Sequence, residues 1–129
     1  MGGSYLLDTN VVVAFFAGDA IVHARFYVAD EPFLSSTVVG ELYFGAYKSE
    51  RVAANVERID TLVANTTQLA CDVETARHYG IIRESLRKKG CPIPENDIWI
   101  AASAIQHGLT LATRDQHFEN VEGLLRESW

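Results

Sequence analysis

Short apolar runs alternate along this chain with longer segments in which apolar residues recur every three or four positions. The short runs predict β-strands at residues 5–7, 32–35, 67–71, 109–112 and 124–125. The longer segments predict helices at residues 11–17, 37–47, 51–64, 74–89 and 94 to 106 or 107. Because strand and helix alternate, we expect an α/β three-layer sandwich with a central, mainly parallel β-sheet flanked by helices.

Glycine and proline residues mark the ends of the later helices. Gly90 closes the segment 74–89, and Pro94 opens the next helix, which Gly108 ends. No repeat, low-complexity tract or linker interrupts the pattern. With 129 residues, 48% of them hydrophobic, we expect one domain, residues 1–129, that buries its core without a disulfide or structural metal.

The cysteines and the first apolar stretch bear on where the protein acts. Cys71 and Cys91 form no CxxC pair and match no zinc spacing, so we interpret them as reduced thiols. The stretch 11–17 is too short to span a bilayer, and it follows Asp8 rather than a basic segment. We therefore expect a cytoplasmic protein with no membrane partner.

Four acidic residues lie beside the apolar segments that should build the core: Asp8, Glu41, Asp97 and Asp115. Asp8 and Asp115 each follow a predicted strand, and open α/β sheets bind ligands at the carboxyl ends of their strands. Either residue would also suit the N-cap of a following helix or turn, so each position alone has two interpretations.

Glu41 and Asp97 belong to predicted helices. The residues three and four positions from Glu41 include no Lys or Arg, although a solvated helix face remains the alternative. Asp97 lies in the first turn of a helix whose continuation, residues 98–102, is almost wholly apolar. A helix-dipole contribution of about 0.3–1 kcal/mol explains an acid there, but not its place at the head of so apolar a helix.

Burying bare carboxylates costs several kcal/mol or more unless they are paired or bind a cation. Hard divalent cations take oxygen ligands, so the four acids predict a Mg²⁺ or Mn²⁺ site. Two such ions about 3.5–4 Å apart can hold a phosphodiester for hydrolysis without a histidine base. Zinc is disfavoured, and the scattered histidines are interpreted as surface or capping residues: His23, His78, His107 and His117.

The charge balance limits how the chain could meet nucleic acid. A formal net charge of −6 disfavours tight non-specific binding to a phosphate backbone, although bound cations would reverse the field locally. Arg83, Arg87 and Arg114 are the candidates for RNA contact. Arg83 and Arg87 share a helix face near its end, where cations also suit the helix dipole.

Four motifs resemble those of the PIN domain, specifically of the VapC toxin type. They are YLLDTN at 5–10, GEL at 40–42, IPENDIWIAA at 93–102 and LATRDQHF at 111–118. Each alone is a weak signal, but all four in this order and spacing are a strong one. The resemblance implies a PIN-like sandwich and a Mg²⁺- or Mn²⁺-dependent endoribonuclease, the toxin of a type II toxin–antitoxin system, that cuts single-stranded or loop RNA, often tRNA.

The resemblance also implies roles and partners. Asp8, Glu41 and Asp97 match the family's core metal ligands, and Asp115 matches its more variable fourth acid. Asn10 and Thr113 match supporting positions. The expected partners are a VapB-like antitoxin, whose peptide lies in a hydrophobic groove, and a second copy of the chain in a homodimer. Aromatic residues could line such a groove or pack in the core: Phe15, Phe16, Tyr43, Phe44 and Tyr47.

Other functions stay open from the residues alone. A HAD-like phosphatase also begins with an Asp after its first strand, but it needs a second Asp where this chain has Asn10. A phospho-acceptor receiver domain needs a Lys after its last strand, and none follows Leu125. A catalytically silent PIN-like scaffold, or a DNA-cutting relative of the flap endonucleases, would keep the same acids.

Overall fold

The computed structural model describes residues 3–129 of the chain. Its elements are, in order, β1 (Ser4–Leu7), α1 (Thr9–Phe16), α2 (Ala20–Val28), β2 (Glu31–Ser35), α3 (Ser36–Tyr47), α4 (Val52–Ala64), β3 (Thr67–Leu69), α5 (Val73–Lys89), α6 (Glu95–Gln106), β4 (Thr110–Ala112), the 3₁₀ helix η1 (Gln116–Asn120) and β5 (Arg126–Glu127).

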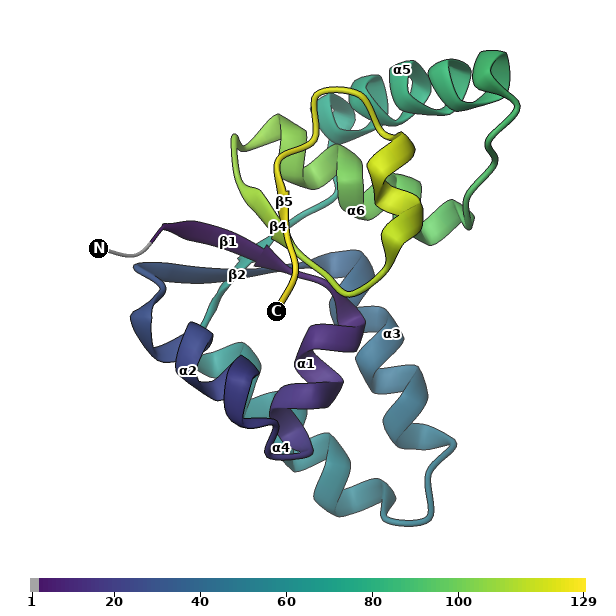
Figure 1. The fold of residues 1–129 in the computed structure, drawn as a ribbon. Coiled ribbons are helices and arrows are strands. Elements are labelled where there is room, and N and C mark those ends of the chain that lie inside the picture. The colour runs from purple at the N-terminus through teal and green to yellow at the C-terminus, as the bar shows by residue number, and fades with distance from the viewer. Residues whose placement is uncertain (1–2) are drawn as a thin grey trace.

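The five strands form one parallel sheet in the order β3-β2-β1-β4-β5. Figure 1 shows α1–α4 on one side of the strands and α5 and α6 on the other. The crossovers from β1 to β3 step one way along the sheet, whereas the crossover from β3 to β4 returns past β1. Right-handed crossovers in opposite directions place their helices on opposite faces. The predicted three-layer α/β sandwich is confirmed.

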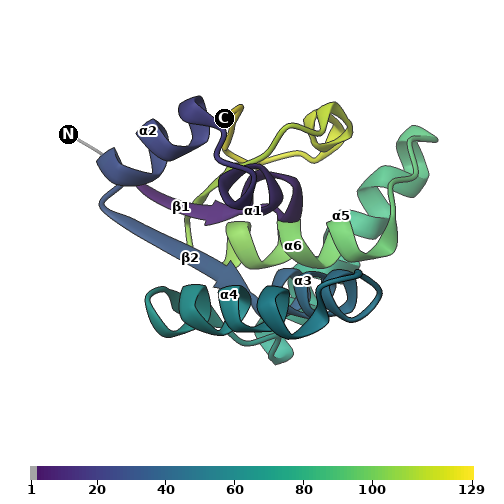
Figure 2. The same ribbon diagram turned by 90° about the horizontal axis from the view of Figure 1, so that it is seen from below.

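The core lies on both faces of the sheet. Leu6, Leu34 and Leu111, on three neighbouring strands, are fully buried, as expected for parallel strands covered on both sides. Within the helical layers, α3 packs with α4 and α1 with α2, while α5 packs along α6 (Figure 2). The stretch 100–104 of α6 is buried without a break, so this helix is the inner one of its layer.

The helix α2 is absent from the sequence prediction. Gly18, at φ 82°, lets the chain turn after α1, and Asp19 then caps α2 by accepting hydrogen bonds from the backbone N–H groups of Ile21 and Val22. Within the helix only Val22 is buried, whereas Ile21 and Tyr27 are exposed. The apolar residues of α2 are therefore spread around the helix, and they do not form the single stripe by which amphipathic helices are predicted.

The last strand differs from the prediction as well. β5 comprises Arg126 and Glu127 rather than residues 124–125, so that prediction is wrong by two residues. Leu125 contributes its carbonyl oxygen to the backbone N–H of Leu111, but its side chain is exposed. At this edge of the sheet polar side chains occupy the strand, and hydrophobicity does not mark it.

No single helix within residues 3–129 is long and apolar enough to cross a membrane. α1 and α2 reach that length only together, across a bend of 110°. Cys71 and Cys91 are both free.

Candidate metal centre

The four predicted acids line one cleft of about 790 Å³ at the carboxyl ends of β1 and β4. The helices that follow β1 and those that lead into β4 lie on opposite faces of the sheet. The strand order reverses between β1 and β4, and this reversal leaves a crevice outside the ends of the two strands. Open α/β sheets bind ligands in such crevices. The structure thus brings together residues that are up to 107 positions apart in the sequence: Asp8, Glu41, Asp97 and Asp115.

Asp8 is the most buried of the four, with 3% of its surface exposed. The backbone N–H of Thr9 donates to its Oδ1 at 2.8 Å, and the hydroxyl of Thr113 donates to its Oδ2 at 2.7 Å. Burial raises the pKa of Asp8 to about 6; these two hydrogen bonds oppose the shift, and the charges of Asp97 and Asp115 add to it. Asp8 therefore caps α1 and also presents an uncompensated carboxylate to the cleft.

Glu41 is half-buried on α3, and within the described part of the chain its carboxylate accepts hydrogen bonds from two neutral side chains. The hydroxyl of Thr9 donates to its Oε1 at 2.6 Å, and the amide of Asn96 donates to its Oε2 at 3.4 Å. Since Thr9 also donates its backbone N–H to Asp8, one residue fixes two of the four acids. Glu41 does not belong to a solvated helix face.

Asp97 lies in the first turn of α6 with only 13% of its side chain exposed. The N-cap position of α6 is Pro94, and no side chain caps this helix, so Asp97 is not used as a cap. Its Oδ2 lies 2.7 Å from Nε2 of His117. Burial raises the pKa of Asp97, the neighbouring imidazole lowers it, and the charges of Glu41 and Asp115 raise it further.

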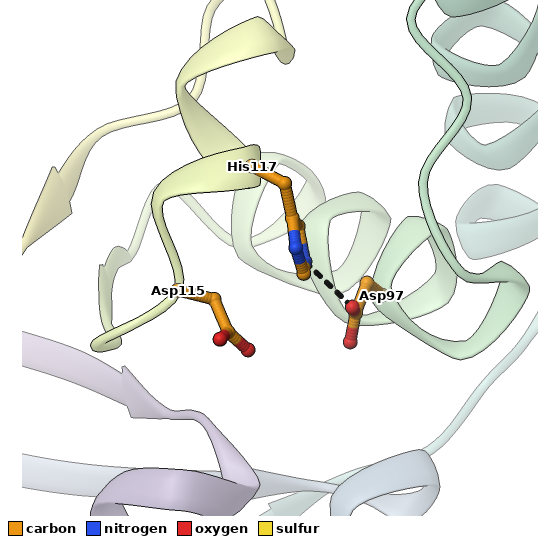
Figure 3. Close-up of side chains that lie close together, drawn as sticks. All are labelled: Asp97, Asp115 and His117. Carbon is orange, nitrogen blue, oxygen red and sulfur yellow. Dashed lines mark ion pairs between the residues drawn. The ribbon is translucent and has the colours of Figure 1, made fainter.

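Asp115 occupies the N-cap position of η1, but its side chain makes no capping hydrogen bond. Instead its backbone N–H donates to the hydroxyl of Thr113 at 3.0 Å. Its carboxylate is left to the cleft, where ligand atoms of Asp115, Asp97 and His117 all lie within 4.8 Å of one another (Figure 3).

His117 is the site residue that the sequence reasoning missed. It projects from η1 toward Asp97, beside Asp115, so its interpretation as a surface or capping residue is wrong (Figure 3). The spacing Asp115-Gln116-His117 within one tight turn was the available signal. His107, by contrast, does occupy the C-cap position of α6, as interpreted.

The two predicted supporting residues both tie parts of the cleft together. Thr113 donates its hydroxyl to Asp8, as described above. The side-chain oxygen of Asn10 accepts the backbone N–H of Arg114 at 3.3 Å, which joins the start of α1 to the loop after β4. Both contacts fix the relative position of the two strand ends that carry Asp8 and Asp115.

No Lys or Arg within residues 3–129 forms an ion pair with any of the four acids. The basic residues predicted to contact RNA are engaged elsewhere. The pairs are Arg83 with Glu95 at 3.5 Å, Arg87 with Glu84 at 2.6 Å and Arg114 with Asp19 at 2.8 Å. An RNA contact by these side chains stays a prediction, since each would exchange an existing partner for a phosphate.

The donor chemistry of the cleft fits a hard divalent cation. Burial raises the pKa values of Asp8 and Asp97, Glu41 is half-buried, and the imidazole next to Asp97 is the only basic partner of the four acids within residues 3–129. Carboxylate oxygens in such a setting are the ligands that Mg²⁺ and Mn²⁺ take in proteins. The acidic cluster can therefore hold a metal ion.

A second cavity, of about 800 Å³, adjoins the cleft and shares Thr9, Val13, Glu41 and Asn96 with it. Most of its walls are apolar and come from α1, α3 and α4. Two of the aromatic residues predicted to line a groove, Phe16 and Phe44, do line this cavity. The ring of Phe15 instead stacks on His23, and the hydroxyl of Tyr43 donates a hydrogen bond to Asp60.

Comparisons with known proteins agree with this geometry. Residues 5–124 match the family model of the PIN domain. The chain is 38% identical to Ribonuclease VapC2 of Haemophilus influenzae and 34% identical to the tRNA(fMet)-specific endonuclease VapC of Shigella flexneri, in each case over 97% of both chains. It therefore belongs to the PIN-domain family, in the branch of the VapC ribonucleases.

Solved structures support the same assignment. The crystal structure of VapBC2 from Rickettsia felis, bound to a DNA fragment of its promoter, matches with a TM-score of 0.91 and 27% identity over 98% of both chains. DNA-bound VapBC from Salmonella typhimurium matches with a TM-score of 0.91 and 30% identity, over 100% of this chain and 99% of that one. The PIN resemblance is confirmed, and the HAD-like phosphatase and the receiver domain are excluded.

Proposed function

We propose that this PIN domain, residues 1–129, is the toxin of a type II toxin–antitoxin system and that it hydrolyses RNA with divalent cations held by four acids: Asp8, Glu41, Asp97 and Asp115. The observation that carries the proposal is the cleft itself, in which these carboxylates converge and no Lys or Arg of residues 3–129 pairs with them. The ribonuclease names of the relatives support the choice of RNA.

The residues around the acids hold them in place for binding. Thr9 fixes Asp8 and Glu41 to each other, and Thr113 holds the second oxygen of Asp8. Because these partners are neutral, they orient the carboxylates without cancelling their charge. Each oxygen keeps a free lone pair, since a carboxylate oxygen accepts about two hydrogen bonds.

The cation proposed for the cleft is Mg²⁺ or Mn²⁺. When bound, it supplies Lewis acidity toward the phosphodiester and toward an attacking water. The chain contributes the negative oxygens that position it, and the walls formed by α3 and α6 set where the substrate phosphate lies. Asp8, with its pKa near 6, is the group whose ionisation limits cation binding below neutral pH.

The substrate proposed is structured RNA, with tRNA as the leading class, because the Shigella flexneri relative is named as tRNA-specific. A chain with a net charge of −6 gains little from phosphate contacts alone, so recognition would depend on RNA shape and on unpaired bases. A DNA-cutting activity remains the alternative, since metal chemistry does not read the 2′-hydroxyl.

The partners proposed are a VapB-like antitoxin and a second copy of the chain. The apolar cavity between α1, α3 and α4 opens beside the acids, so a peptide seated in it would reach the cleft. The related solved structures are named as VapBC complexes, two of them with DNA. A cytoplasmic location, where RNA and antitoxin are made, completes the proposal.

The test is a cleavage assay on tRNA and on single-stranded DNA of matched length, with Mg²⁺, Mn²⁺ or EDTA. We expect cation-dependent cleavage of RNA by the wild type and by Asp30→Asn, which changes an exposed acid outside the cleft, and none by Asp8→Asn. Cleavage in EDTA, or equal rates for Asp8→Asn, would refute the site. Sequencing RNA ends after induced expression would then locate the cut.

A further inference from the structure

We propose that His117 is a nitrogen ligand of the cation that Asp97 and Asp115 hold, and that it makes this end of the cleft prefer transition-metal ions such as Mn²⁺ over Mg²⁺. The inference rests on the divalent-cation centre of the proposed function. It adds a ligand that the four-acid site does not contain, and with it a metal preference.

The three side chains lie close enough together to hold one ion. One ligand atom from each lies within 4.8 Å of the other two, and Figure 3 shows His117 and Asp97 pointing toward one another with Asp115 beside them. An octahedral ion with ligands at about 2.1 Å places neighbouring donor atoms about 3 Å apart and opposite ones about 4 Å apart. The 2.7 Å between Nε2 of His117 and Oδ2 of Asp97 lies near the neighbouring separation.

The Nε2 atom of His117 points at the carboxylate of Asp97 (Figure 3). Nε2 is buried and lies 2.7 Å from Oδ2 of Asp97, so the imidazole faces the carboxylate that the cation would use. A cation held by Asp97 and Asp115 would therefore meet this nitrogen as well.

The turn that carries His117 is held rigidly. Phe118, the next residue, is fully buried and anchors η1 in the core. The carbonyl oxygen of His117 accepts a hydrogen bond from the side-chain amide of Asn120 at 3.3 Å, and the backbone N–H of Asp115 is tied to Thr113. The two donors from this turn are therefore positioned before any ion binds, which lowers the cost of binding.

An imidazole changes which ion the site prefers. Mg²⁺ takes oxygen ligands and keeps much of its water, whereas first-row transition metals accept nitrogen readily, with affinities that rise from Mn²⁺ along the series. A site of two carboxylates and one imidazole should thus gain affinity for Mn²⁺ from His117 and gain little for Mg²⁺.

The test uses the metal-free protein and Mn²⁺, without RNA. Electron spin-echo spectroscopy of bound Mn²⁺ detects a directly coordinated ¹⁴N, and labelling the histidines with ¹⁵N assigns that signal to imidazole. We expect the signal in the wild type and in His78→Gln, a control on α5 away from the cleft, and its loss in His117→Gln. Calorimetry should show Mn²⁺ binding weakened about tenfold or more in His117→Gln, with Mg²⁺ binding changed less than about twofold.

A wild-type spectrum with bound Mn²⁺ and no imidazole nitrogen would overturn the proposal, and it does not depend on whether the variant folds. Equal losses for Mn²⁺ and Mg²⁺ would also overturn it, because His117 would then act as an ion-pair partner that orients Asp97. Neither outcome affects the proposed ribonuclease activity, which the Asp8→Asn cleavage assay tests separately. A wild type that binds neither ion would contradict both proposals.

Discussion

Acidic side chains have opposite surroundings in the cleft and on the outer surface of α5. On α5, Glu74 pairs with Arg77 and Glu84 with Arg87, one turn apart on the same helix and open to solvent. In the cleft, Asp8 is almost fully buried and only neutral donors reach it. These two acids on α5 are open to water and have basic partners, whereas the buried Asp8 has no basic partner within residues 3–129. The difference indicates that the cleft is completed by a cation from outside the chain.

The largest effect should come from removing a cleft charge. Asp8→Asn keeps the size of the side chain but removes its charge, so we expect RNA cleavage to fall by about 10³-fold or more, on the scale of losing a catalytic group. Single-turnover cleavage at saturating Mn²⁺ measures this. A cleavage rate of Asp8→Asn within tenfold of the wild-type rate would contradict the difference drawn between the cleft acids and the surface acids.

A smaller loss is expected from Thr113→Val, which removes the hydroxyl that donates to Asp8 and leaves the shape nearly unchanged. We expect metal affinity or cleavage to fall by about 10–100-fold, the usual range for a residue that orients a ligand. The pKa of Asp8 should rise further, because that hydrogen bond lowers it. Calorimetric titration across pH 5–8 would show the shift, and an unchanged profile would mean that Thr113 does not orient Asp8.

The free energy of unfolding of the metal-free protein should show the cost of burying the charge of Asp8. The pKa of Asp8 is about 6 in the folded protein, against an ordinary value of 3.8. The folded state therefore binds its proton more tightly, and this group's contribution to stability is full below pH 4 and is lost as the pH rises through 6. At pH 7 the loss amounts to about 3 kcal/mol as an upper estimate.

Asp8→Asn should remove this pH dependence. In EDTA, urea unfolding should show the variant more stable than the wild type at pH 7 and similar to it at pH 4. Asp97→Asn should change stability in the same direction, since burial also raises the pKa of Asp97. A variant less stable than the wild type at pH 7 would show that the charged carboxylate stabilises the folded state in the absence of metal.

The smallest effect is expected on the α5 surface, and the matched pair Glu84→Gln and Glu41→Gln sharpens the comparison. Arg87 lowers the pKa of Glu84, but the pair is exposed and screened by water. Glu84→Gln should leave metal affinity and cleavage unchanged, whereas Glu41→Gln should reduce both. If the two variants lost cleavage alike, charge on the whole surface rather than in the cleft would control the activity.

Much of this architecture could be predicted from local patterns. The strands that end at Leu7 and Ala112 are apolar runs closed by polar residues, so the positions of Asp8 and Asp115 at strand ends follow from the sequence. The position of Asp97 follows from the helix start that Pro94 marks, and Glu41 falls inside the helix predicted at residues 37–47.

The rest depended on contacts that no local pattern encodes. His117 enters the site because η1 places it against Asp97 of α6, and its position two residues after Asp115 was the only hint of this in the sequence. Arg83 faces Glu95 only because α5 packs along α6, so its engagement could not be read from residues 74–89. The helix α2 lacks an apolar stripe, and its capping residue Asp19 was the only signal.

Anomalous diffraction from crystals equilibrated with Mn²⁺ tests the central claim most directly. The account predicts a strong anomalous peak in the cleft, bounded by the side chains of Asp8, Glu41, Asp97 and Asp115, and no comparable peak among the paired acids of α5. A cleft without a peak at saturating Mn²⁺, with the carboxylates turned toward basic side chains instead, would contradict it.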